Sequence, residues 1–94
     1  MDERTLQRHI IAYLNEQPGV WALKTIASNR RGAPDLLCCV RGQFVGFEVK
    51  APGKLRTVSP LQHHQINQIR LCGGIAEAVD NLERVKSLIA SVDR

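Results

Sequence analysis

An α/β fold is predicted for this chain, with a mixed four-stranded sheet flanked by helices in the order αβββαβα. Three observations predict it. Residues 3–16 carry an apolar stripe with helical spacing. Residues 32–50 contain two apolar, partly alternating runs separated by a turn, which is the pattern of a β-hairpin. Residues 43–79 follow a strand, helix, strand pattern, a crossover unit whose two strands should run parallel.

The first helix is expected to begin after Asp2, a favourable N-cap residue. Its apolar stripe consists of Leu6, Ile10, Tyr13 and Leu14. Glu3 continues this stripe by one turn, with Gln7 on the same side, so its carboxylate should point along the buried face. On spacing alone, the simpler explanation for Glu3 is a favourable interaction with the helix dipole, worth roughly 0.3–1 kcal/mol.

A first strand is predicted over residues 20–27, followed by a polar loop over 28–32. Arg30 and Arg31 in this loop lead directly to Asp35. Pro34 restricts the preceding residue to extended geometry, which stiffens the entry to the next strand. A stiff, basic approach to a carboxylate suits a phosphate held beside a metal, although the two arginines could equally be solubilising loop residues.

The hairpin over 32–50 is expected to turn at Arg41-Gly42, so that paired residue numbers sum to 83. Asp35 then lies opposite Glu48, with Cβ atoms roughly 4.5–5.5 Å apart, a distance at which like charges repel. A cation between the two carboxylates would explain this placement. A four-residue loop is the alternative, and it would pair Asp35 with Lys50 in an ordinary salt bridge.

The two faces of this hairpin differ. One is entirely apolar and should be buried, and it consists of Leu36, Cys38, Val40, Val45, Phe47 and Val49. The other face carries Asp35, Glu48 and Lys50 at the open end of the hairpin. Three ionisable groups beside a core form either a functional site or an ion pair that is expensive to bury.

After Lys50, a loop over 51–58 carries Lys54 and Arg56. A helix over 60–72 should follow, because Ser59 and Gln62 form a capping box around Pro60. Gln62 also begins an inward stripe with Ile66 and Ile69, so one side chain could serve both the cap and a site. His63 and His64 are expected to face solvent or contact phosphate. A last strand over 75–79 and a final helix capped by Asp80 complete the chain.

Length and composition indicate one domain spanning residues 1–94. No apolar run approaches the roughly 20 residues of a membrane span, and no signal-like segment is recognised, so a cytoplasmic protein without a membrane partner is expected. The net charge is +4, and the segment 24–56 carries seven bases and two acids, a net charge of +5. Nucleic acid is the natural partner of such a segment, and a well-solvated surface is the alternative.

The motif residues resemble a known superfamily. Pro34-Asp35 followed by Glu48-Val49-Lys50 is similar to the PD-(D/E)xK signature of restriction-endonuclease-like nucleases. Glu3 and Gln7, the run Gly32-x-Pro34-Asp35-Leu36, and Ser59-x-x-Gln62 resemble the virus-type replication-repair nuclease (VRR-NUC) family within it. The likeness covers about residues 3–80 and implies a restriction-endonuclease-like core.

The resemblance also implies roles. Asp35, Glu48 and the main-chain carbonyl of Val49 would bind Mg²⁺, with Mn²⁺ able to substitute and no small-molecule cofactor. Lys50 would orient or deprotonate the attacking water. Glu3 would approach the metal or a second ion, and Gln62 would position Lys50 or the water. Whether Glu3 or only Gln7 reaches the site stays open. The basic side chains expected to contact DNA are Lys24, Arg30, Arg31, Lys54, Arg56 and His63.

Short stand-alone members of the family look like Holliday-junction resolvases that act as homodimers, so the resemblance implies a metal-dependent endonuclease for branched or four-way DNA. Such an enzyme would take part in DNA repair in a bacterial cell or a phage-infected host. Three alternatives remain open. The chain could be a flap or nicking nuclease acting as a monomer, a nucleic-acid-binding module without catalysis, or a structural α/β protein whose Lys50 forms an ion pair.

Overall fold

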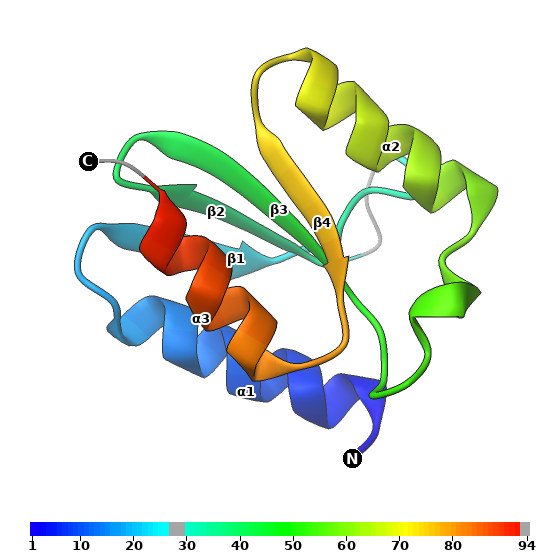
Figure 1. Cartoon of the computed structure of the whole chain (residues 1–94), viewed down its shortest axis with the longest axis horizontal. Coiled ribbons are helices and arrows are strands. Elements are labelled where there is room, and N and C mark those ends of the chain that lie inside the picture. The colour runs from blue at the N-terminus through cyan, green and yellow to red at the C-terminus, as the bar shows by residue number, and fades with distance from the viewer. Residues whose placement is uncertain (27–29, 93–94) are drawn as a thin grey trace.

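The computed structural model describes residues 1–26 and 30–92. The predicted element order is confirmed, with one short 3₁₀ helix added (Figure 1). The elements are α1 (Glu3–Glu16), β1 (Val20–Lys24), β2 (Leu36–Val40), β3 (Gln43–Val49), η1 (Leu55–Thr57), α2 (Pro60–Leu71), β4 (Ile75–Val79) and α3 (Leu82–Ser91). No helix in the described ranges combines the length and apolar character needed to span a membrane.

The four strands form one mixed sheet in the order β1-β2-β3-β4. β1 pairs with β2 and β2 with β3 in antiparallel fashion, whereas β3 and β4 are parallel. A parallel pair needs a connection that returns to the same end of the sheet, and α2 with its flanking loops provides it. The strand, helix, strand unit predicted from the sequence is therefore confirmed.

Helices α1 and α3 lie side by side and cover one face of the sheet (Figure 1). The apolar hairpin face points toward them and is buried as expected, from Leu36 to Val49. These strand residues pack with Leu6, Ile10 and Leu14 of α1 and with Val85, Leu88 and Ile89 of α3 in one core. α2 packs over β3 and β4 on the other face, which leaves the charged hairpin face between the sheet and α2.

The hairpin turns through a two-residue loop at Arg41-Gly42. Val40 pairs with Gln43 and Leu36 with Phe47, so the paired numbers sum to 83 and the four-residue loop is wrong. Both loop residues have positive φ, 48° for Arg41 and 89° for Gly42, as the primed hairpin turns require. Arginine is unfavourable in this conformation, but its guanidinium donates to the carbonyls of Ile89 and Val92 at 2.6 and 2.8 Å. It thereby satisfies the C-terminal carbonyls of α3.

The first strand is shorter than the predicted 20–27, because β1 ends at Lys24. Thr25 N–H still donates to the Asp35 carbonyl at 2.8 Å, which adds one bond beyond the assigned strand. The next partner in this register would be Pro34, which has no N–H to donate, so the pairing stops there. Residue 27 and the loop positions 28 and 29 lie outside the described residues.

Two details of the second half also differ from expectation. The loop over 51–58 contains the single-turn helix η1. The final helix is capped by Asn81, whose side chain accepts from Arg84 N–H at 2.8 Å, and not by Asp80. Asp80 instead accepts from Gly53 N–H at 3.0 Å, which ties the loop after β3 to the end of β4. Both are short acceptors that suit a cap, and in the structure Asn81 takes that role while Asp80 binds the loop after β3.

Candidate active site

Asp35 and Glu48 lie at the open end of the hairpin, where β2 begins and β3 approaches its end. The Asp35 side chain reaches across to β3, and its Oδ2 accepts from Val49 N–H at 2.9 Å. The two carboxyl groups are close enough for Asp35 to be one of the main influences on the protonation of Glu48. The two predicted acids are therefore brought together on one side of the sheet.

Glu48 is buried, with only 2% of its surface exposed. Its Oε2 accepts from Gln62 Nε2 at 3.1 Å and lies 3.9 Å from Lys50 Nζ. Its Oε1 is buried and receives no donor from any described residue. A buried carboxylate oxygen without a donor destabilises the ionised form of Glu48. That form therefore needs one more partner than the described residues supply.

The pKa of Glu48 is raised from 4.5 to about 8, and burial is the largest cause. Asp35 contributes to the same increase, because a protonated Glu48 can share its proton with the Asp35 carboxylate and because two neighbouring negative charges repel. The Lys50 ammonium acts in the opposite direction, and the more distant Glu3 charge adds to the increase. Near neutral pH the pair thus holds an extra proton unless a cation takes its place.

Gln62 combines the two roles that the sequence left open. Its Oε1 accepts from Ser59 N–H at 2.8 Å, and Ser59 Oγ accepts from Gln62 N–H at 3.1 Å, which completes the capping box of α2. Its Nε2 is then directed at Glu48. The cap therefore holds the amide in the orientation that the site uses. Gln62 contacts Glu48 in the structure, whereas the resemblance predicts that it positions Lys50 or a water.

Lys50 directly follows β3, and its backbone N–H donates to the Val79 carbonyl of β4 at 2.9 Å. Its side chain is 11% exposed and its only ion pair among the described residues is with Glu48. Burying an ammonium is expensive without a counter-ion, and the Glu48 carboxylate lies within ion-pair distance to serve as one. The backbone bond to β4 and the charge contact with Glu48 of β3 therefore hold Lys50 beside the acid pair.

The backbone before Asp35 is anchored by contacts that the motif does not reveal. The Thr25 hydroxyl lies 2.8 Å from the Pro34 carbonyl and 3.0 Å from the Asp35 carbonyl, and can donate to either. On the other side, the Pro34 ring packs against Gly46, where an added Cβ would lie 3.1 Å from Pro34 Cγ. Thr25 and Gly46 thus position the Pro34-Asp35 segment. Sequence spacing offers no signal for Thr25, because it contacts the motif across the intervening loop.

The two residues of α1 differ in burial. Gln7 is 7% exposed, whereas Glu3 is exposed. Glu3 is nevertheless near enough for its charge to act on Glu48. In the part of the chain that the structure describes, no three His, Cys, Asp or Glu side chains gather as a metal cluster. A direct role of Glu3 at the acid pair therefore stays a prediction.

The residues at the acid pair fit a hard divalent cation. Asp35 and Glu48 offer carboxylate oxygens, which Mg²⁺ and Mn²⁺ prefer, and no residue in the described ranges donates to Glu48 Oε1. Mg²⁺ is commonly held by one or two carboxylates together with waters and substrate phosphates, so two acids suffice. The Val49 carbonyl is a predicted third ligand, and the bond from Val49 N–H places its peptide beside Asp35.

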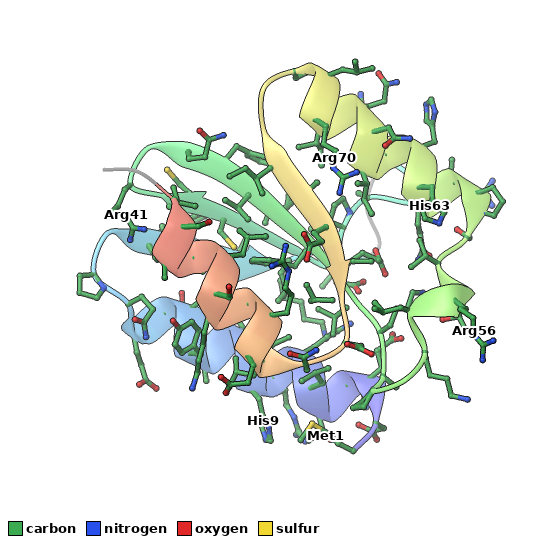
Figure 2. The ribbon with its side chains drawn as sticks, viewed as in Figure 1. Met1, His9, Arg41, Arg56, His63 and Arg70 are labelled. Atoms are coloured by element: carbon green, nitrogen blue, oxygen red, sulfur yellow. The ribbon has the colours of Figure 1, made fainter. Side chains whose placement is uncertain are left out.

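The basic residues predicted to contact DNA are all exposed, but they are not gathered in one place. Arg30 and Arg31 line a cleft of about 480 Å³ together with Asp35. The loop that carries them is held against α2, because Gln65 Nε2 donates to the Arg31 carbonyl at 3.2 Å. Arg56 and His63 lie together on the side formed by η1 and the start of α2 (Figure 2). Lys24 and Lys54 do not line that cleft.

Comparison of the sequence with models of known families gives no match, and neither does comparison with curated proteins. Solved structures do match. One described as "VRR_NUC domain" superposes with a TM-score of 0.79 at 26% identity, over 97% of this chain and 97% of that chain. Another, "VRR_NUC domain protein", gives a TM-score of 0.76 at 17% identity, over 96% of this chain and 86% of that chain.

This chain has the VRR_NUC fold. The resemblance drawn from the motif residues is thereby confirmed at the level of the whole architecture. The VRR_NUC likeness extends over nearly the entire chain, so it includes the hairpin, α1 and α2, which carry the acid pair, Lys50 and Gln62.

Proposed function

We propose that this protein is a metal-dependent nuclease that hydrolyses DNA phosphodiester bonds at Asp35, Glu48 and Lys50. The observation that carries the proposal is the Glu48 carboxylate, which is buried beside Asp35 with one oxygen that receives no donor from the part of the chain that the structure describes. A structural ion pair would satisfy that oxygen, whereas a cation-binding site leaves it for the ion. The similarity to VRR_NUC domains supports the same conclusion.

In this proposal, Asp35, Glu48 and the Val49 carbonyl hold Mg²⁺ or Mn²⁺. When bound, the ion neutralises phosphate charge and lowers the pKa of a water molecule. Lys50 is held by Glu48 at the same place, where its ammonium orients the attacking water and offsets negative charge on the phosphate. Gln62 fixes the orientation of Glu48. Arg30 and Arg31 attract the phosphate backbone toward Asp35.

The substrate we propose is branched or four-way DNA, cut by a homodimer. A chain of 94 residues presents a small surface, and a twofold pair would present two sites and a wider basic surface. Trp21 and Leu23 on the edge strand β1 are 64% and 38% exposed, and such apolar side chains suit burial against a second copy. Flap cleavage by a monomer is the competing substrate preference.

The nuclease proposal is tested by incubating purified protein with labelled DNA in Mg²⁺, Mn²⁺ or EDTA. We expect cleavage only with a metal ion, and its loss in Asp35→Ala and Glu48→Gln while DNA binding persists. Asp80→Asn is the matched control, because Asp80 is an acid that binds Gly53 in a loop, and its cleavage should equal that of wild type. Binding of DNA without cleavage by the wild-type protein in any metal would leave only a binding module, and equal cleavage by Asp35→Ala and wild type would show that Asp35 takes no part in the reaction.

The substrate and assembly are tested separately. Junction, flap, duplex and single-stranded DNA of equal length are compared, and the mass of the free protein is measured by light scattering. We expect the junction to be cut fastest by a species of twice the chain mass, and Trp21→Ala to weaken that dimer. Exclusive flap cutting by a monomer would contradict the proposed junction resolvase but would agree with the proposed nuclease activity.

A further inference from the structure

A pocket of about 540 Å³ lies between α2 and the outer face of the sheet, beside the candidate active site. Leu37 of β2, Phe44 of β3 and Ile69 of α2 form its apolar walls. The amides of Gln65 and Gln68 and the side chain of Arg30 also line it. The described lining residues include no acid. The apolar walls suit a ligand with an apolar surface, the two glutamines suit one with polar atoms at its edge, and Arg30 suits one that is attached to an anion.

The pocket is adjacent to the acid pair, because it shares Thr25, Arg30 and Ala33 with the cleft that contains Asp35. Pro34 lines it and directly precedes Asp35. Leu37 follows Asp35 by two residues on β2, and Phe44 precedes Glu48 by four on β3, all on the same face of the sheet. At about 3.4 Å per strand residue, these walls lie roughly 7–14 Å from the carboxylates. A polymer strand whose phosphate sits at Asp35 and Glu48 would therefore reach the pocket with a neighbouring unit.

We propose that this pocket receives one nucleobase, turned out of the stack, from the DNA strand being cut. The inference deepens the proposed function and rests on it. Phe44 is 44% exposed and offers an aromatic surface on which any base can stack. Gln68 supplies a donor and an acceptor for a base edge, and Gln65, whose Nε2 already donates to the Arg31 carbonyl, supplies its oxygen as a further acceptor. This base would lie one or two nucleotides away from the cut phosphate, where branched DNA already has unpaired or weakly stacked positions.

This occupant fits better than a second protein chain for a chemical reason. Arg30 lines both this pocket and the arginine cleft at Asp35, so a phosphate backbone held at the acid pair would pass the same cation on its way to the pocket. Amides and a cation around an aromatic surface are typical of sites for single-stranded nucleic acid. By holding a base that has left the stack, the pocket would favour binding of distorted DNA at the acid pair.

The test measures binding of branched DNA to the Glu48→Gln protein, which should leave the DNA uncut. The cut position is first mapped with the active protein. Each nucleotide within three of it is then replaced in turn by an abasic site. We expect one of these replacements to weaken binding about 5- to 150-fold, the effect of losing one stacked base. In Phe44→Ala, the affinity ratio of intact to abasic DNA at that position should fall toward one.

Leu71→Ala is the matched control, because Leu71 is an exposed apolar residue of the same helix α2 but is not among the residues that line the pocket. It should keep the ratio of the parent protein even if its overall affinity changes. A second approach avoids any folding defect of Phe44→Ala. Cys72 is exposed and lines the pocket, so N-ethylmaleimide on folded Cys39→Ser protein should block the pocket and lower the same ratio.

The outcomes separate this inference from the proposed function. A protein that cuts branched DNA but binds intact and abasic strands equally would overturn the base pocket alone. A Phe44→Ala protein that loses its dimer and keeps the ratio would show that a second copy occupies the pocket. A protein that cuts no DNA under any metal condition would defeat the proposed function, and this inference with it.

Discussion

Gln62 donates from Nε2 to Glu48 Oε2 at 3.1 Å, while its own Oε1 accepts from Ser59 N–H at 2.8 Å. One amide therefore completes the cap of α2 and binds a buried carboxylate on β3. Because the amide has only one carbonyl oxygen, use of that oxygen in the cap leaves the NH₂ group for Glu48. The start of α2 is thereby linked to the geometry of the acid pair.

The two roles of Gln62 can be separated by mutation. Ser59→Ala removes only the cap acceptor, so it should lower the free energy of unfolding by about 0.5–2 kcal/mol and leave the cleavage rate near wild type. Gln62→Leu removes both bonds, so stability and cleavage should both fall, the latter about tenfold or more. Denaturant titration and single-turnover cleavage measure the two effects. Equal cleavage rates in both variants would show that the bond to Glu48 has no catalytic role.

The buried acid should make stability depend on pH in the absence of metal. The pKa of Glu48 is about 8 in the folded protein, against 4.5 for the unfolded chain, so the folded state holds more protons between these values. The free energy of unfolding should therefore fall as pH rises from about 4.5 to about 8, by at most about 1.4 kcal/mol per pH unit. Urea titrations in EDTA across this range measure it.

Glu48→Gln provides the control for that experiment, because the amide does not titrate. Its stability should be flatter with pH than that of wild type, and the difference between the two proteins should be greatest above pH 8. Parallel curves for the two proteins would contradict the raised pKa of Glu48.

Replacing the buried ammonium should affect catalysis more than DNA binding. Lys50→Met keeps the length of the side chain but removes the charge beside Glu48. We expect cleavage to fall about 10²- to 10³-fold, as when one electrostatic group at a reacting phosphate is lost. Lys86→Met, on α3 and the opposite face of the sheet, should cut DNA at the wild-type rate. If Lys50→Met weakened DNA binding as much as cleavage, Lys50 would be a phosphate contact and not a catalytic group.

Gly46→Ala should displace the segment that carries Asp35. The added Cβ would lie 3.1 Å from Pro34 Cγ and 3.5 Å from Ile69 Cδ1, and Pro34 is buried and anchored through Thr25. Overpacking of this kind costs about 1–3 kcal/mol, and the shift of Asp35 should also slow cleavage. The two effects can be followed by thermal unfolding and by cleavage rate.

Gly73→Ala is the control that lowers stability without displacing Asp35. Gly73 has a φ of 89° and open space around its Cβ position, so alanine there should destabilise the chain through backbone strain alone. Its cleavage rate should stay near wild type at a temperature where both variants are folded. Equal loss of cleavage in both would mean that Gly46 acts only through stability.

Much of the hairpin could be predicted from the sequence. The apolar alternation of its strands and Gly42 at the turn determined the register that places Asp35 opposite Glu48. The Ser59-Pro60-Leu61-Gln62 run likewise predicted both the start of α2 and an inward amide. These features are local, because strand alternation, turn geometry and helix caps depend on residues within a few positions of one another.

The remaining features depend on contacts between distant segments, and only the tertiary structure decided them. Pro34 ends the pairing of β1 early, Arg41 binds the end of α3, and Asn81 caps α3 while Asp80 accepts from Gly53. The pocket beneath α2 likewise exists because a helix and two strands meet there. The sequence by itself determined which acids, lysine and amide share a face, since side-chain direction follows from local geometry. Burial, and with it the raised pKa of Glu48, was decided by the layers that cover that face.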